Sequence, residues 1–127
     1  MFMAYKRKLE KDIRCPLDYG MDVFGGKWKS RVLCVLSDGP LRYSQLRSEM
    51  ANVTDAALAG ALKDLQTNGL ISRKQYEEIP PRVEYGLTPK GASVIPVLQT
   101  ICRWSGNFYR NVEDDALPRC KKCDYSG

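Results

Sequence analysis

The sequence contains no histidine. The usual Ser–His and Cys–His pairs of nucleophilic catalysis are therefore excluded, and the commonest protein ligand for transition metals is missing. The chain also lacks a glycine-rich phosphate loop and a convincing acid–base pair of side chains. We therefore expect a protein that is not an enzyme and that carries no cofactor.

Long apolar runs are absent as well. The apolar stretches are short, such as 32–36, and none approaches the roughly 20 residues that a helix needs to span a bilayer. No apolar segment follows the charges near the N-terminus, as it would in a signal peptide. We expect a cytoplasmic protein with no membrane partner.

The composition is that of one globular domain. A chain of 127 residues with 43% hydrophobic residues can form a single modest core. Lys and Arg number 20 against 15 Asp and Glu, which gives a net charge of +5. Such an excess favours a polyanionic partner, because bound Lys and Arg release counterions from phosphates. An excess of this size is common, so any argument for nucleic acid must come from the motifs.

The stretch 53–70 carries a complete helix signal. Thr54 can cap the helix by accepting a backbone N–H, and Asp55 is favourable beside the positive helix end. Gly69 supplies the left-handed residue that commonly ends a helix. Three leucines at helical spacing share one face that needs a core: Leu58, Leu62 and Leu65. The pattern predicts a four-turn helix with a defined beginning and end.

Three further helices are predicted before it. One runs over 16–24, opened by Cys15-Pro16 and ended by Gly25-Gly26, with Leu17, Met21 and Phe24 on its inner face. The second covers about 27–37, and its core positions are Trp28, Val32, Val35 and Leu36. After a short extended piece at 41–43, Ser44 caps a small helix that reaches Met50. Together with 53–69, these elements make a helix-turn-helix pattern.

After Gly69 the spacing of the apolar residues changes from a helical period to alternation. Residues 70–76 and 82–87 read as two strands joined by a charged loop with prolines, which predicts a β-hairpin. Thr88-Pro89 then begins a long final helix, bent in its first part by Pro96. That helix has more apolar positions than one domain needs, so we expect it to pack on a second copy of the chain in a homodimer. The alternative is that these residues belong to the core of a single chain. The expected interface residues are Val94, Val97, Leu98, Ile101, Trp104 and Phe108.

Four motifs together resemble HxlR-type winged helix-turn-helix transcriptional regulators, relatives of the MarR class. They are Cys15-Pro16, Gly25-Gly26-Lys27-Trp28, the segment from Asp38-Gly39 to Leu46-Arg47, and Pro80-Pro81-Arg82-Val83-Glu84-Tyr85 with Leu87-Thr88 and Gly91. The resemblance covers residues 15–113 and leaves out a basic arm, 1–14, and a tail, 114–127. It implies a mainly α fold with a small β-hairpin (α+β), the wing, and a long C-terminal dimerisation helix.

The resemblance also implies a cytoplasmic dimer that binds double-stranded operator DNA with two half-sites. The helix 53–69 then enters the major groove and the wing lies on the flanking backbone. Lysines and arginines around the wing and at the start of the helix 27–37 can neutralise phosphates. The candidate DNA-binding residues are Lys27, Lys29, Thr54, Asp55, Ala56, Ala59, Gly60, Lys63, Arg73, Lys74 and Arg82.

The outward face of the helix 53–69 departs from the family pattern. Family members usually carry Lys at the position of Ala56 and polar residues at those of Ala59, Gly60 and Ala61. Direct readout of bases normally uses Arg, Lys, Asn or Gln. We therefore expect specificity to depend strongly on the wing, on backbone contacts and on DNA shape. The alternative function is a winged-helix module that binds protein and does not read DNA.

The five cysteines leave several interpretations open. Cys15 lies before a helix N-terminus and beside Arg14, which both favour the reactive thiolate. In related sensors of oxidants and electrophiles the cysteine at this position is the sensing thiol, and a partly buried structural thiol is the alternative. Cys34 fits the core, whereas Cys102 fits either packing or crosslinking.

The two ends of the chain are equally open to interpretation. Cys120 and Cys123 supply half of a tetrahedral zinc site; a disulfide-forming pair and an inert flexible tail are the alternatives, and we expect no metal. The basic arm 1–14 is either a solvated segment or a contact to DNA backbone or to a partner subunit.

Overall fold

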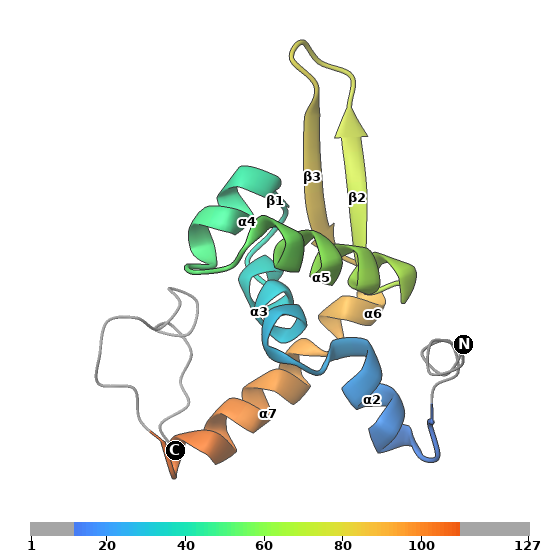
Figure 1. Ribbon diagram of the computed structural model, residues 1–127, viewed down its shortest axis with the longest axis vertical. Coiled ribbons are helices and arrows are strands. Elements are labelled where there is room, and N and C mark those ends of the chain that lie inside the picture. The colour runs from blue at the N-terminus through green and yellow to red at the C-terminus, as the bar shows by residue number, and fades with distance from the viewer. Residues whose placement is uncertain (1–11, 110–127) are drawn as a thin grey trace, which may run out of the picture.

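A computed structural model describes residues 12–109 of the chain. Its helices and strands follow the predicted order (Figure 1). They are α2 (Pro16–Phe24), α3 (Lys27–Leu36), β1 (Leu41–Arg42), α4 (Tyr43–Glu49), α5 (Asp55–Thr67), β2 (Ile71–Tyr76), β3 (Arg82–Leu87), α6 (Pro89–Ala92) and α7 (Ile95–Gly106). The predicted winged helix-turn-helix fold is confirmed.

The core lies where α3, α4 and α5 meet. The helical period of α5 buries the three leucines that the sequence assigned to one face, together with Ala61. Figure 1 shows α5 running across α3, with α4 beside it at its N-terminal end. The fully buried side chains with the largest volumes come from these helices and from the turns that follow α4 and α5: Leu33, Leu36, Leu46, Met50, Leu58, Leu65, Leu70 and Val32. The face of α5 opposite this core is consequently turned outward.

The wing is a long antiparallel hairpin. β2 and β3 pair in register from Ile71↔Leu87 to Tyr76↔Arg82, and the hairpin extends away from the helices (Figure 1). The short segment β1 pairs with the other edge of β3, so that the sheet has the order β1-β3-β2. The sequence predicted the hairpin and an extended piece at 41–43, but not that this piece joins the wing.

Two predicted details of the helices are wrong. Leu17 and Met21 were assigned to the inner face of α2, yet they are 67% and 49% exposed, and the core contacts of α2 come from Val23 and Phe24. The small helix α4 begins at Tyr43, one residue before Ser44. Its cap is Arg42, whose backbone N–H donates to Oε1 of Gln45 at 2.9 Å.

The predicted long final helix is two helices. Pro96 has no N–H to donate to the carbonyl of Ala92, so the helical hydrogen-bond pattern is interrupted between α6 and α7. Thr88 caps α6 as predicted, since its hydroxyl accepts the N–H of Gly91 at 3.1 Å. The break is larger than the bend that the sequence suggested.

Gly91 joins α6 to the start of the wing. It is buried, and a Cβ at this position would collide with the carbonyl oxygen of Leu70. The hydroxyl of Thr88 also donates to the carbonyl of Gly69, at 2.6 Å. The residues before β2 and after β3 are therefore held together at the base of the hairpin.

Gly91→Ala should destabilise the protein, because the added methyl group meets backbone that cannot move aside. We expect a loss of about 1–3 kcal/mol in the free energy of unfolding, the usual cost of overpacking. Gly60→Ala is the matched control: a Cβ there meets no atom within 4 Å, and Ala in a helix interior is favoured over Gly by about 0.5–1 kcal/mol. Urea denaturation measures both. Equal midpoints for the two variants would contradict this account of Gly91.

Candidate nucleic-acid interface

Between Asp55 and Lys63, the exposed face of α5 carries no functional group. Thr54 caps the helix, its hydroxyl accepting the backbone N–H of Ala57 at 3.0 Å. Ala56, Ala59 and Gly60 follow on the outward side, and Lys63 stands one turn further on. All of these residues are exposed, as predicted, but Ala56, Ala59 and Gly60 carry no side chain beyond Cβ. The surface over the first half of α5 is consequently smooth.

Asp55 is the exception at the beginning of this face. Its Oδ1 accepts two hydrogen bonds, from the hydroxyl of Tyr43 at 3.1 Å and from Nε of Arg47. The hydrogen bond from Arg47, then that from Tyr43, lowers the pKa of the Asp55 carboxyl below its ordinary value of 3.8. Burial, followed by the hydrogen bond to Asp55, raises the pKa of Tyr43 above its ordinary value of 10.0. Asp55 therefore stays ionised at neutral pH.

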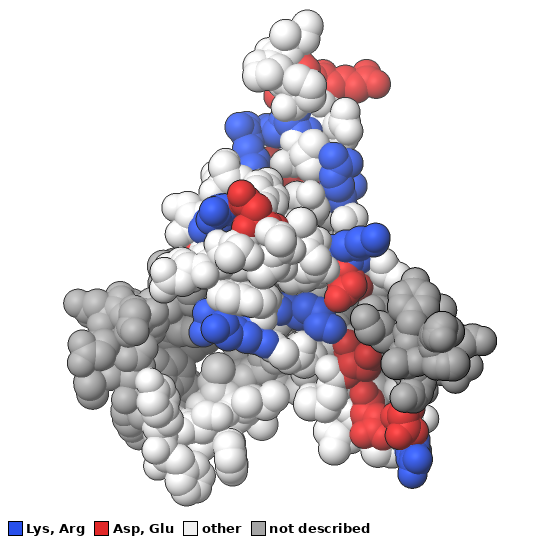
Figure 2. Space-filling model, in the orientation of Figure 1, with Lys and Arg blue, Asp and Glu red and all other residues white. Residues whose placement is uncertain are grey.

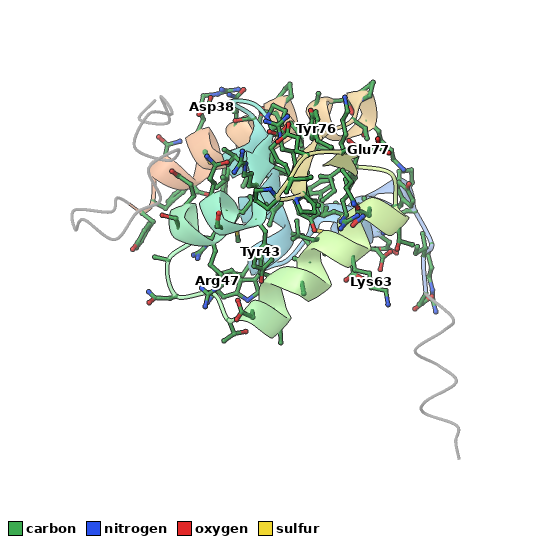
Figure 3. The ribbon with its side chains drawn as sticks, turned by 90° about the horizontal axis from the view of Figure 1, so that it is seen from above. Asp38, Tyr43, Arg47, Lys63, Tyr76 and Glu77 are labelled. Atoms are coloured by element: carbon green, nitrogen blue, oxygen red, sulfur yellow. The ribbon has the colours of Figure 1, made fainter. Side chains whose placement is uncertain are left out.

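Tyr43 and Arg47 were not among the candidate residues predicted from the sequence. Figure 3 shows both lying together at the N-terminal end of α5, whereas Lys63 lies further along that helix. Arg47 is fixed additionally by a hydrogen bond from its guanidinium to the carbonyl of Val53 at 3.2 Å. The available signal was their spacing of four residues on α4, which puts both side chains on one helix face.

The cations of the wing fall into two groups. Arg73 and Lys74 are exposed on β2, with the Lys74 ammonium 4.8 Å from the centre of the Tyr76 ring. Arg82 on β3 is half-buried: its guanidinium lies 3.9 Å from the same ring centre and forms ion pairs with Glu78 at 3.1 Å and Glu84 at 3.8 Å. Arg82 is thus engaged within the hairpin, although the sequence grouped it with the phosphate contacts.

The two candidate lysines of α3 are also engaged. The Lys27 ammonium lies 4.6 Å from the centre of the Trp28 ring, and that of Lys29 donates to the carbonyl of Asp22 at 2.6 Å. Figure 2 shows Lys and Arg on both sides of the wing and below α5, whereas Asp and Glu gather along α2 and at the wing tip. The basic side chains on this face therefore lie on the hairpin and below α5, on either side of a mostly uncharged α5 surface.

The helix α7 divides the predicted interface residues into two sets. Val94 and Leu98 are buried in the chain's own core, so their side chains are not available to a partner. Trp104 and Phe108 are 66% and 77% exposed, with ring centres 5.3 Å apart. Val97 and Ile101 extend this exposed apolar strip. A groove of about 340 Å³ between α2, α3 and α7 adjoins it and is lined by Ile101, Cys34 and Cys102, among others.

Cys15 is exposed at the N-cap of α2. Its neighbour Arg14 forms an ion pair with Asp12 at 2.8 Å, and the backbone N–H of Arg14 donates to Asp18 at 3.0 Å. Two carboxylates thus accompany the cation that the sequence placed beside the thiol. Cys34 packs against the core, as expected, and Cys102 is half-buried.

Other expectations fall on residues outside the described part of the chain. Cys120 and Cys123 lie beyond residue 109, and most of the basic arm lies before residue 12. Within residues 12–109, no helix is both long and apolar enough to cross a membrane.

Comparison with known proteins decides the family. The model of the HxlR-like helix-turn-helix family matches residues 23–113. The chain belongs to the HxlR-like helix-turn-helix family. An HTH-type transcriptional regulator of Methanothermobacter thermautotrophicus is 44% identical over 102 residues, which are 80% of this chain and 77% of that protein. The resemblance predicted from the four motifs is thereby confirmed.

Solved structures agree with this assignment. A MarR-family transcriptional regulator from Porphyromonas gingivalis W83 has a TM-score of 0.71 at 35% identity, covering 78% of this chain and 97% of that one. The redox regulator HypR in its oxidised form also has a TM-score of 0.71, at 34% identity, covering 77% of this chain and all of that one. The family consists of helix-turn-helix, DNA-binding transcriptional regulators.

Proposed function

We propose that this protein is a homodimeric, sequence-specific transcriptional regulator that acts in the cytoplasm on operator DNA with two half-sites. The observation that carries the proposal is the exposed face of α5, which lies beside a hairpin bearing Arg73 and Lys74. A helix of 13 residues presented in this way fits the major groove, and a hairpin next to it reaches the flanking backbone.

The free and engaged cations have different roles in this proposal. Arg73 and Lys74 are exposed on β2 and neutralise phosphates. Arg82 neutralises Glu78 and Glu84 instead and stacks on Tyr76, so it maintains the shape of the wing. Lys27 is exposed and lies over an aromatic ring as Lys74 does, so it remains a candidate for a phosphate contact. Lys29 is a weaker candidate, because it is half-buried and donates to the carbonyl of Asp22.

A second copy of the chain covers the apolar strip of α7. Three large apolar side chains on α7 and one just after it exceed what a monomer usually exposes without a function: Val97, Ile101, Trp104 and Phe108. A two-fold arrangement of this helix places two copies of α5 at the spacing of operator half-sites. Val94 and Leu98 support α7 from the inside.

Cys15 is the proposed site of control by oxidants or electrophiles. Its thiol is exposed at the start of α2, and the other end of that helix lines the groove that α7 borders. The similarity to the redox regulator HypR supports this assignment. Chemical modification there changes the charge and the packing of α2, and through the dimer it alters the spacing of the two α5 helices.

The alternative function is a protein-interaction module without specific DNA reading. The lack of long polar side chains at Ala56, Ala59 and Gly60 favours it, because bidentate base recognition needs such side chains.

A gel-shift experiment with DNA upstream of the protein's own gene, titrated with salt, separates the two functions. We expect binding that weakens steeply with salt, and a slope that Lys74→Gln lowers by about one unit for each subunit bound. Arg103→Gln on α7 is the control for loss of one cation, and its slope should match the wild type. Absence of salt-sensitive binding would favour the interaction module.

Ile101→Glu should dissociate the dimer, because it buries a charge in an apolar contact between two chains. Sedimentation of the wild type is expected to give the mass of two chains, and that of the variant the mass of one. Ile79→Glu makes the same change at the fully exposed loop of the wing and should remain dimeric. A dimeric Ile101→Glu variant would refute the proposed interface.

Diamide should change the affinity of the wild type for its operator by about fivefold or more, the lower end of the usual coupling between two sites. Cys15→Ser should abolish this response. Cys34→Ser is the matched control, because it removes a thiol that packs against the core. This variant should respond to diamide like the wild type. An unchanged response in Cys15→Ser would remove Cys15 as the sensor.

A further inference from the structure

We infer that Asp55 reads the amino group of a cytosine in each operator half-site and so determines specificity on α5. The inference rests on the proposed function, since it requires α5 in the major groove. Asp55 is the first residue of α5, and the N-terminal residues of a recognition helix are those that contact base edges. Its side chain is 72% exposed although it holds an ion pair.

The carboxylate of Asp55 is oriented before any DNA is bound. Tyr43 and Arg47 both donate to Oδ1, so one side of the carboxylate is directed toward α4. Within residues 12–109, Oδ2 accepts no hydrogen bond and remains available to an outside donor. A side chain fixed in this way loses less conformational freedom on binding than an unsupported one.

The neighbouring residues let this carboxylate approach the bases. Ala56, Ala59 and Gly60 have no side chain beyond Cβ, so α5 can enter the groove deeply. No atom of the chain lies within 4 Å of the position that a Cβ on Gly60 would take, so internal packing does not require a glycine there. The fold does not require small residues at these positions, whereas close approach of the helix to DNA does.

Base chemistry selects cytosine. A carboxylate that stays ionised can only accept hydrogen bonds, and only cytosine and adenine present an amino group in the major groove. Adenine places its N7 acceptor next to that amino group, and guanine and thymine present acceptors, all of which repel the carboxylate. Cytosine offers the N4 amino group without an adjacent acceptor on the same base.

Neutralising the charge of Arg47 is not sufficient to explain the position of the Asp55 carboxylate. The guanidinium of Arg47 has a second partner in the carbonyl of Val53, two residues before α5, so it already has two acceptors at the beginning of that helix. Tyr43 adds a second donor, because its hydroxyl also donates to Asp55. The two donors from α4 converge on one exposed oxygen and thereby fix the position of the carboxylate. An exposed ion pair that served stability alone would not need the second donor.

Selection of binding sites from random double-stranded DNA by the full-length protein tests the inference. We expect the wild type to enrich a motif with a cytosine in each half-site that is preferred over other bases by about tenfold. Asp55→Asn should lose or change the preference at that position only, since Asn favours adenine. Asp64→Asn removes the same charge further along the exposed side of α5 and should keep the wild-type motif.

Tyr43→Phe provides a second variant that keeps the packing of the ring. It removes one donor to Asp55, so the cytosine preference should weaken at the same position and less than in Asp55→Asn. An unchanged preference at every position in Asp55→Asn would overturn the inference while leaving the DNA-binding function intact. Tighter binding of all sequences by Asp55→Asn would overturn it too, because Asp55 would then only neutralise Arg47. A wild type that enriches no motif would refute the sequence-specific function itself.

Discussion

The burial of one face of α5 is the constraint on which the rest of the structure depends. Leu58, Leu62 and Leu65 are buried against α3, and each such side chain contributes about 1.5–3 kcal/mol to folding. Because an α-helix is rigid over 13 residues, fixing this face also fixes which residues point outward. The outward direction of Asp55, Ala59 and Lys63 therefore follows from hydrophobic packing, independently of any interaction with DNA.

The wing is held in relation to α5 by contacts at its base. Leu70 closes the end of α5 and is fully buried, and its carbonyl accepts the N–H of Thr88 at 3.0 Å. Gly91 packs against the same carbonyl, where any larger residue would collide. The segments on either side of the hairpin thus meet at one point of the core. As a consequence, α5, the wing and α6 form one unit whose surfaces keep a fixed relation.

Periodicity and turn residues were sufficient to predict α5, the hairpin and the order of the elements, because those features depend on neighbours in the sequence. Pro96 indicated a distortion in the final helix, but not that the helix would be divided into α6 and α7. The exposure of Leu17 could not be predicted, since apolar residues at helical spacing do not show whether the chain or a partner covers them. The contacts of Asp55 with Tyr43 and Arg47 join two helices, and no local pattern specifies them.

Pairing inside the chain decides which charges are available to a partner. Arg82 and Lys74 lie in the same hairpin, but Arg82 is occupied by Glu78 and Glu84, whereas Lys74 contacts the Tyr76 ring and remains exposed. The same rule applies at the beginning of α5, where Arg47 of α4 is engaged by Asp55 and by the carbonyl of Val53. A count of basic residues consequently overstates the surface that can neutralise phosphates. In the proposed function, contact with phosphates is therefore restricted to the cations that the fold leaves exposed, and Asp55 is a carboxylate that the fold orients at the beginning of α5.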